Sequence, residues 1–556
     1  MSILRFTTIL ALAPLAAIGQ SPGLDPAKIA RIDSLFKKYD RTDAPGCALG
    51  VSQRDNVVLE RAWGNAQLEF GIPITPATKF EAGSVSKQFT AAAVLRLAQQ
   101  GKLSLDDDIR KHAPEVPRYD QTITVRNLIH HTSGLRDWGA VMTIAGWPRG
   151  TRTYTHAHVL DILGRQRGLN YPVGSEYLYS NSNYNLMAII VERVSGESLS
   201  AFTRREFFEP LGMTSTSWRD DYTRVVPGRA QAYSPTGSAW RLDMPFENVY
   251  GNSSLLTTVG DLLKWNANLA HMRVGGAELV ASQLRRGKLT TGREIRYAGG
   301  IFVDEFVGTK ELWHDGATAG YRAFLARYPD AGFAVALLCN AGDANPSQIG
   351  RQVAAIVTPP QAPARAASRD TVGLPINAER LAALAGDYRS ARTDEAVRLI
   401  VANGRLRQVD GPALVAVSER EFTSPSGRTH LLFDPAPTGR VSRIRVWVDD
   451  GDTTDYLPAA APSAAALSDY VGRYASADAE IEFEFRPEKD TLVLLARPST
   501  RLPLRPVYRD GFTAMGSTFR FTRAATGRVD GFLLTSGRVR RLRFERVSPV
   551  LPARPN

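Results

Sequence analysis

A serine and a lysine three positions apart, Ser84 and Lys87, begin the alanine-rich stretch EAGSVSKQFTAAAVLRL (81–97). Alanine-rich stretches favour helix, and residues three apart share one helix face. A lysine within hydrogen-bond reach can activate a serine hydroxyl as a nucleophile. The same spacing recurs at Ser34 and Lys37 within a predicted amphipathic helix. Spacing alone therefore leaves open whether Ser84 is a nucleophile or a helix-capping serine.

A tyrosine and an asparagine two positions apart, Tyr179 and Asn181, follow a Pro-x-Gly turn and precede the apolar stretch NYNLMAIIVERVSG. A loop between turn and helix would hold the tyrosine in one place. Its phenol has a pKa of about 10 in water, and nearby cations would favour the phenolate, a usable base. The amide of Asn181 suits orienting a lysine or a substrate amide. Tyr250 and Asn252 match the same bare pattern, so spacing again does not decide.

A third group is His314-Asp315-Gly316, within the predicted strand ELWHDGATAG (311–320). A glycine in a strand allows close approach of another backbone, such as that of a peptide substrate. Two further histidines, His130 and His131 in LIHHTSGL, are predicted to be structural. Metal binding is the weaker alternative for them, because no third ligand is evident.

In this order, SVSK, YSN and HDG resemble the three-motif set of the penicillin-recognising serine hydrolases. Tyr-x-Asn as the middle element is similar to class C β-lactamases, DD-peptidases and related esterases. The stretches LIHHTSGL and PVGSEYLYSNSNY are also typical of this group. Strand-like segments at 46–64 and 311–340, with helix-rich sequence between them, predict an α+β fold, an antiparallel sheet with a helical insertion. The resemblance covers about residues 25–357. It implies no cofactor and no metal.

The resemblance also implies a role for each matching residue. Ser84 would be the acyl-accepting nucleophile, and Lys87 and Tyr179 would share general acid/base catalysis. The backbone N–H groups of Ser84 and Ala317 would form the oxyanion hole. The predicted substrate-binding residues are Asn181, His314, Gly316 and Ala317.

The third motif departs from the Lys-Thr-Gly that is usual in β-lactamases. His-Asp-Gly removes a fixed positive charge that would attract a substrate carboxylate, and it places Asp315 beside the site. A site short of cations suits a free amine or a neutral ester better than a β-lactam carboxylate. Residues 251–263, GNSSLLTTVGDLL, also lack the double glycine often found there, so the floor of the cleft is expected to differ.

Composition and charge place the chain among globular proteins. With 556 residues, 43% hydrophobic and 22% charged, it is expected to form two to four domains. The net charge of +12 comes mainly from scattered arginines without a basic run, which argues against nucleic-acid binding.

The N-terminal stretch MSILRFTTILALAPLAAIG predicts a signal peptide over residues 1–20, and hence a secreted or periplasmic protein without a membrane anchor. Cys47 and Cys339 are the two cysteines of the chain, and both lie in or beside predicted strands. They could form one bridge in an oxidising compartment or remain buried thiols.

The remaining organisation follows from composition shifts. A hydrolase domain at 25–357 precedes a Pro/Ala/Arg-rich linker at 358–370 and two β-barrel-like domains at 371–460 and 464–550, each expected to be a small antiparallel barrel or a curled sheet. An internal repeat links the last two. Its matching pairs are Gly386-Asp387-Tyr388 with Gly472-Arg473-Tyr474, Glu421-Phe422-Thr423 with Gly511-Phe512-Thr513, and Thr438-Gly439-Arg440-Val441 with Thr526-Gly527-Arg528-Val529.

A serine hydrolase domain followed by two similar β domains resembles D-aminopeptidases, in which a loop of the second barrel reaches the active site. We therefore expect D-aminopeptidase-like hydrolysis of small peptides or amides through an acyl-enzyme on Ser84, with cell-wall-derived D-amino-acid peptides as candidate substrates. The alternatives are an esterase, a β-lactamase or DD-carboxypeptidase, and an exported binding protein without catalysis. The sequence leaves the oligomeric state open.

Overall fold

The structure, a computed structural model, describes residues 23–358 and 373–547, except 410, 426–428, 437–439, 449–452, 460–466 and 498. The predicted signal peptide and almost all of the predicted linker lie outside these residues, as do Thr438 and Gly439 of the repeat. The proposed domain boundaries stay predictions. Within the described residues, no helix has the length and apolarity needed to span a bilayer.

A six-stranded antiparallel sheet forms the centre of the first part of the chain. Its strands, in spatial order, are β10 (Phe302–Phe306), β11 (Thr309–Thr318), β12 (Tyr321–Tyr328), β13 (Phe333–Cys339), β1 (Cys47–Gln53) and β2 (Asn56–Trp63). The middle strands are apolar on both faces because helices cover both. The helices in contact with the sheet are α8 (Val259–His271) and α10 (Pro346–Val357), with α1 (Pro26–Leu35) packed on α10.

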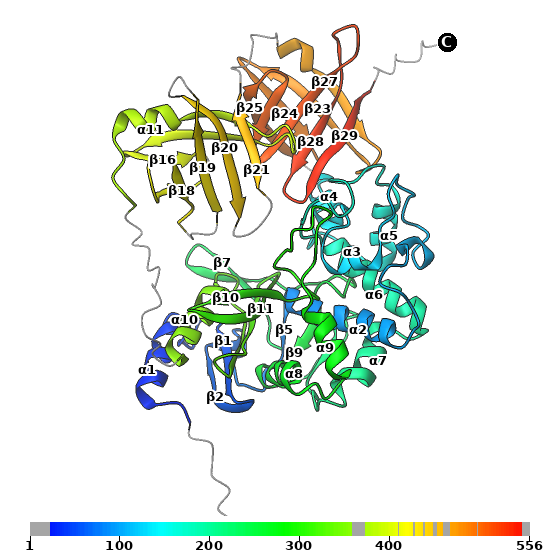
Figure 1. The fold of residues 1–556 in the computed structure, drawn as a ribbon, viewed down its shortest axis with the longest axis vertical. Helices are drawn as coiled ribbons and strands as arrows, with labels where there is room; N and C mark the ends of the chain where they lie inside the picture. Colours follow the sequence, from blue (N-terminus) through cyan, green and yellow to red (C-terminus); the bar gives the residue numbers. More distant parts are fainter. Residues whose placement is uncertain are drawn as a thin grey trace, which may run out of the picture.

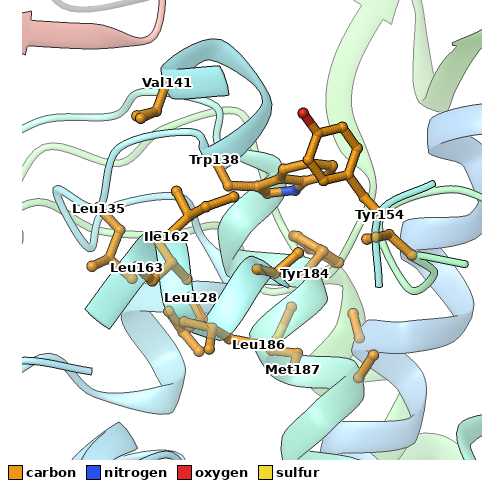
Figure 2. Close-up of a cluster of buried hydrophobic side chains, with 14 of the residues drawn as sticks. Leu128, Leu135, Trp138, Val141, Tyr154, Ile162, Leu163, Tyr184, Leu186 and Met187 are labelled. Carbon is orange, nitrogen blue, oxygen red and sulfur yellow. The ribbon is translucent and has the colours of Figure 1, made fainter. Parts of the chain in front are cut away.

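A helical insertion separates β2 from β10, as expected for the α+β fold (Figure 1). Its helices are α2 (Lys87–Gln99), α3 (Val125–Ile129), α4 (Trp138–Ile144), α5 (His156–Gly164), α6 (Asn181–Ser195), α7 (Leu199–Thr203) and α9 (Gly276–Leu284). Figure 2 shows part of the core of this insertion, with Trp138, Tyr184 and Met187 facing the same interior. Helix α6 is buried from Ser182 to Val191 and packs on α2. The N-terminal ends of these two helices carry the first two motifs.

Short strands complete this part of the chain. They are β3 (Asn65–Gln67), β4 (Ile72–Pro73), β5 (Phe80–Glu81), β6 (Ser217–Trp218), β7 (Tyr233–Thr236), β8 (Ala239–Leu242) and β9 (Leu255–Thr257).

Two antiparallel β units follow, each opening with a short helical segment. The first contains α11 (Ala378–Leu384), β14 (Gly386–Arg389), β15 (Ala396–Ala402), β16 (Arg405–Gln408), β17 (Val415–Ala416), β18 (Glu421–Thr423), β19 (Thr429–Pro435), β20 (Val441–Val448) and β21 (Thr454–Pro458). The second contains a 3₁₀ turn at Leu467–Tyr470, then β22 (Gly472–Ser476), β23 (Ile481–Glu488), β24 (Thr491–Ala496), β25 (Thr500–Tyr508), β26 (Gly511–Ala514), β27 (Ser517–Arg523), β28 (Val529–Ser536) and β29 (Val539–Arg546).

The two β units differ in closure. Strands β22–β29 close into a barrel, whereas the first unit is an open eight-stranded sheet in the order β16-β15-β14-β21-β20-β19-β18-β17. An isolated bridge joins Arg407 of the edge strand β16 to Ala413, which precedes the other edge strand, β17. The predicted fold class is therefore confirmed. Of the two forms expected for the β units, the first unit is a curled, open sheet and the second a closed barrel.

The repeated Gly-x-Tyr motif has the same structural role in both units. Gly386 and Gly472 have φ values of +152° and +144°, a region that disfavours side chains. The hydroxyl of Tyr388 donates to the carbonyl of Leu384, and that of Tyr474 donates to the carbonyl of Tyr470. Each tyrosine thereby satisfies a carbonyl at the end of the preceding helical segment.

The cysteines face each other across β1 and β13. Cys47 and Cys339 are register partners in this antiparallel pair and form a disulfide. Of the two alternatives left open by the sequence, the structure has the bridge.

Candidate active site

Ser84 lies in a 3₁₀ turn, Gly83–Ser86, that leads directly into α2. The turn is held from both sides, since the Ser86 hydroxyl donates to the Gly83 carbonyl and accepts the Leu255 N–H. Gly83 has a φ of +52°, and a Cβ on it would lie 2.6 Å from the nitrogen of Ala317. Glycine at this position lets the turn approach strand β11 closely.

Lys87, the first residue of α2, has a fully buried side chain. Its Nζ lies 3.1 Å from Ser84 Oγ, 2.9 Å from Asn181 Oδ1 and 2.7 Å from the carbonyl oxygen of Asn252. Burial holds the pKa of Lys87 well below its usual range, and the charge of Arg538 lowers it further. The structure thus brings together the predicted Ser84, Lys87 and Asn181.

Tyr179 lies next to this lysine, with Lys87 Nζ 4.7 Å from the centre of its ring. Its hydroxyl is buried and makes no hydrogen bond of ordinary geometry within the described residues, although Ser84 is near enough to lower the pKa of the phenol. Burial outweighs Ser84 and Arg538 and raises the pKa of Tyr179 above its usual value. The expectation of a phenolate favoured by nearby cations is therefore wrong for this state, because desolvation dominates.

The third motif lies on β11, at the part of the strand that extends past its neighbour β10. A Cβ on Gly316 would lie 2.1 Å from the carbonyl oxygen of Ala82 and 3.0 Å from the nitrogen of Ser84. Only glycine at position 316 therefore allows β11 to cross close to the Gly83–Ser86 turn. This approach brings the backbone amides of Ser84 and Ala317 to the same part of the cleft, as the predicted oxyanion hole requires.

His314 is neutral in the folded protein. Its Nδ1 donates to the carbonyl oxygen of Asp315 at 2.6 Å, so Nε2, 3.1 Å from the Tyr297 hydroxyl, accepts a hydrogen bond. Burial lowers the pKa of His314 to about 4. The Asp315 carboxylate accepts from the Ser347 hydroxyl of α10 at 3.1 Å. The third motif therefore brings no cation into the site, as predicted.

A cleft of about 750 Å³ opens over Ser84. It is lined by residues of the three sequence motifs and by residues of the two β units, including Trp447 and Tyr456 of the first unit. Five arginines also line it: Arg149, Arg296, Arg392, Arg538 and Arg540. The expectation of a site short of cations is wrong, because these arginines come from loops and β units that a motif comparison does not include.

Several residues at the site were not predicted. Arg538 belongs to the turn between β28 and β29, and its guanidinium carbon lies 4.7 Å from the ring centre of Tyr179. Asp137 accepts the backbone N–H of Asn181 at 2.8 Å and so fixes the start of α6. His131 is buried 4.4 Å from the Tyr179 ring and accepts the Ser180 N–H, which supports its predicted structural role.

The second match to each spacing pattern, Ser34 with Lys37 and Tyr250 with Asn252, has a different position in the structure. Ser34 lies in α1, which packs on α10 at the outer face of the sheet, and Ser34 donates to the Arg31 carbonyl. Asn252, from the second Tyr-x-Asn match, reaches the site through its backbone carbonyl, which accepts from Lys87. Its side chain accepts from Asn185 instead. The Tyr-x-Asn match at Tyr250 and Asn252 therefore pointed to a residue at the site. The spacing did not reveal that the contact with Lys87 would be made by the backbone carbonyl of Asn252.

Comparisons with known proteins agree with this geometry. The family described as Beta-lactamase matches residues 32–358. Protein flp of Staphylococcus aureus is 27% identical over 322 residues, which cover 56% of this chain and 62% of flp. The D-aminopeptidase of Gluconobacter oxydans is 26% identical over 380 residues, which cover 67% of this chain and 69% of that enzyme. This chain thus spans less than two thirds of flp.

Among solved structures, the octameric penicillin-binding protein homologue from Pyrococcus abyssi aligns with a TM-score of 0.54 at 20% identity. The alignment covers 85% of this chain and 99% of that chain, so the two share a fold. The family match spans more than half of the chain and contains all three motifs. The chain therefore belongs to the beta-lactamase family, within the penicillin-recognising serine hydrolases.

Proposed function

We propose that the protein hydrolyses small peptide or amide substrates through an acyl-enzyme on Ser84. The observation that carries this proposal is the hydrogen bonding of Lys87. A neutral amine has two N–H groups and one lone pair. Asn181 Oδ1 and the Asn252 carbonyl accept the two N–H groups, which leaves the lone pair for the hydroxyl of Ser84. The low pKa of Lys87 supports this neutral form.

In the proposed acylation, Ser84 Oγ attacks the substrate carbonyl carbon while its proton passes to Lys87 Nζ. The negative charge that develops on the carbonyl oxygen is stabilised by the backbone N–H groups of Ser84 and Ala317. Such preorganised donors contribute about 3–4 kcal/mol each in serine hydrolases.

Tyr179 then acts as the acid. Because its phenol stays protonated, it can donate its proton to the leaving nitrogen as the C–N bond breaks. The proton held by Lys87 restores the phenol. In deacylation a water molecule attacks the acyl-enzyme and gives one proton to Lys87, which passes it to the Ser84 oxygen as the acyl C–O bond breaks. Thus Lys87 takes the proton from each nucleophile and Tyr179 gives one to the leaving nitrogen, which divides between them the general acid/base catalysis that they were predicted to share.

The peptide or amide class is supported by the similarity to the Gluconobacter oxydans D-aminopeptidase. A D-amino-acid residue on the acyl side of the scissile bond is our leading assignment, with an ester as the competing substrate. We also propose that the protein acts after export, in the periplasm or outside the cell. The Cys47–Cys339 disulfide supports an oxidising compartment, in agreement with the predicted signal peptide.

A fluorophosphonate tests the nucleophile. We expect a single covalent adduct, seen as one mass increment on the intact protein, that is absent from Ser84→Ala. Ser34→Ala is the matched control, since it removes the serine of the other Ser-x-x-Lys match, and it should label normally. A folded wild-type protein without adduct would refute the acyl-enzyme and favour a binding protein.

Substrate turnover tests the class. D-alanyl p-nitroanilide, p-nitrophenyl butyrate and nitrocefin report amide, ester and β-lactam hydrolysis in one assay format. We expect the highest kcat/KM for the anilide among the three after correction for each uncatalysed rate. A marked preference for the ester would overturn the peptidase assignment, and efficient nitrocefin turnover would favour a β-lactamase.

A further inference from the structure

We propose that Arg538, from the closed barrel, binds the C-terminal carboxylate of a peptide acid whose last peptide bond is cleaved at Ser84. This inference rests on the function proposed above and specifies its substrate class. A dipeptide with a D-residue on its acyl side fits both the proposed D-residue and the proposed carboxylate site. Its free amine lies on one side of the scissile bond and its carboxylate on the other.

Arg538 is the cleft arginine with the weakest ion pair among those that the structure describes. Its closest carboxylate oxygen belongs to Asp137, at 3.5 Å. That carboxylate already accepts backbone N–H groups from Asn181 and Ala140 at 2.8 and 3.1 Å. A guanidinium has five N–H donors, and the Arg538 side chain is 43% exposed to the cleft. Donors therefore remain for a ligand.

The other cleft arginines are held by closer carboxylates. Glu247 binds Arg149 through two hydrogen bonds, and Asp304 pairs with Arg296. Glu176 pairs with both Arg392 and Arg540. Each of these four arginines has a carboxylate closer than the 3.5 Å between Arg538 and Asp137, although Arg392 and Arg540 share that of Glu176, so Arg538 is the cleft arginine best able to attract an anion.

Arg538 lies no farther from Lys87, the neighbour of Ser84, than one bound amino-acid residue can span. Lys87 Nζ and the Arg538 guanidinium carbon each lie 4.7 Å from the ring centre of Tyr179, so they are separated by about 9 Å at most. One extended residue spans about 3.5 Å, and a hydrogen bond of about 3 Å is added at each end. A carboxylate one residue beyond the scissile bond therefore reaches Arg538.

The turn that carries Arg538 is held firmly against the hydrolase part. The Asn170 side chain donates to the Arg538 carbonyl at 3.0 Å and accepts the Arg540 N–H at 2.7 Å. Arg136, itself buried, pairs with Asp478 of the barrel at 3.1 Å and lies within 3.3 Å of the Arg540 carbonyl. The barrel thus supplies the cation that the His-Asp-Gly motif lacks.

The test compares D-alanyl-D-alanine with its C-terminal amide, which differs only in the charge of the carboxyl group. We expect the wild-type protein to cleave the acid with a kcat/KM roughly 10- to 100-fold above the amide, the range for a hydrogen bond to a charged group. Arg538→Gln should bring this ratio close to one, mainly through KM. Arg538→Lys should retain part of the preference. The ratio cancels any effect of Arg538 on the pKa of Lys87, because both substrates experience it.

Arg543→Gln is the matched control, since Arg543 lies on β29, is 66% exposed and pairs with Glu545 away from the cleft. It should leave the ratio unchanged. Protection of Ser84 from the fluorophosphonate by each peptide provides a second measurement that needs no turnover. If the wild-type protein is labelled at Ser84 but the acid and the amide protect it equally, the carboxylate site alone is overturned. The same holds if the acid-over-amide ratio of kcat/KM is unchanged in Arg538→Gln. Absence of any Ser84 adduct would instead overturn the proposed function.

Discussion

We expect the Arg136–Asp478 ion pair to stabilise the interface between the closed barrel and the hydrolase part, and so to keep Arg538 at the active site. Both side chains are almost fully buried, with 4% and 8% exposure. Asp478→Asn leaves the guanidinium of Arg136 with Gln166 Oε1 at 3.1 Å and carbonyl oxygens at 3.3 Å, but with no counter-charge. Removing one partner of a buried pair costs about 3–5 kcal/mol. Because acceptors remain, we expect about 3 kcal/mol.

That free energy should appear as opening of the interface. At about 1.4 kcal/mol per tenfold, the opening equilibrium should rise roughly 100-fold. The N–H of Arg540 reports it, because its hydrogen bond to Asn170 crosses the interface. Hydrogen–deuterium exchange of the 535–541 segment should therefore accelerate about 100-fold in Asp478→Asn, and the acid-over-amide preference should fall with it.

Asp469→Asn is the control for this variant. Asp469 pairs with Arg523 inside the barrel and is 44% exposed, so its loss should change stability by about 1 kcal/mol or less. Equal exchange rates at Arg540 in the two variants would refute the reasoning, because the buried ion pair would then contribute nothing to docking.

Three other outcomes are expected. The kcat/KM for a neutral substrate should fall as the pH drops through the pKa of Lys87, since a protonated amine cannot accept the serine proton. Arg538→Gln should move this acidic limb of the pH–rate profile to higher pH, because the charge of Arg538 lowers the pKa of Lys87. A move to lower pH would contradict this effect of Arg538. Burial lowers the pKa of His130 to about 4, so the unfolded chain binds more protons below pH 6.5 and the urea midpoint should decrease from pH 7 to pH 5. An unchanged midpoint would mean that His130 titrates alike in the folded and unfolded states. Replacing Cys47 and Cys339 by serine should lower the free energy of unfolding by about 2–5 kcal/mol, and equal denaturation curves would contradict a formed bridge.

Much of the architecture could be predicted from local patterns. The strand-like stretches at 46–64 and 311–340 became β1, β2, β11, β12 and β13. The apolar strands β1, β12 and β13 are buried between covering helices, whereas β2, at the edge of the sheet, is half exposed. The repeated Gly-x-Tyr motif marked two β units with the same helix-to-strand junction. Closure of the second unit alone could not be predicted, since it depends on whether the first and last strands pair.

The sequence by itself determined the chemical groups of the site: Ser84 with Lys87 one turn apart, Tyr179 and Asn181 at the start of a helix, and glycine at 316. These depend on local spacing, which short motifs record. Only the tertiary structure decided the charge states and the electrostatics. Burial lowers the pKa of Lys87 and raises that of Tyr179, which suits them to be the base and the acid of the proposed mechanism. Docking of the barrel brings in Arg538 from 454 positions after Ser84. Desolvation and long-range contacts are properties of the packed molecule, so no local pattern in the chain contains them.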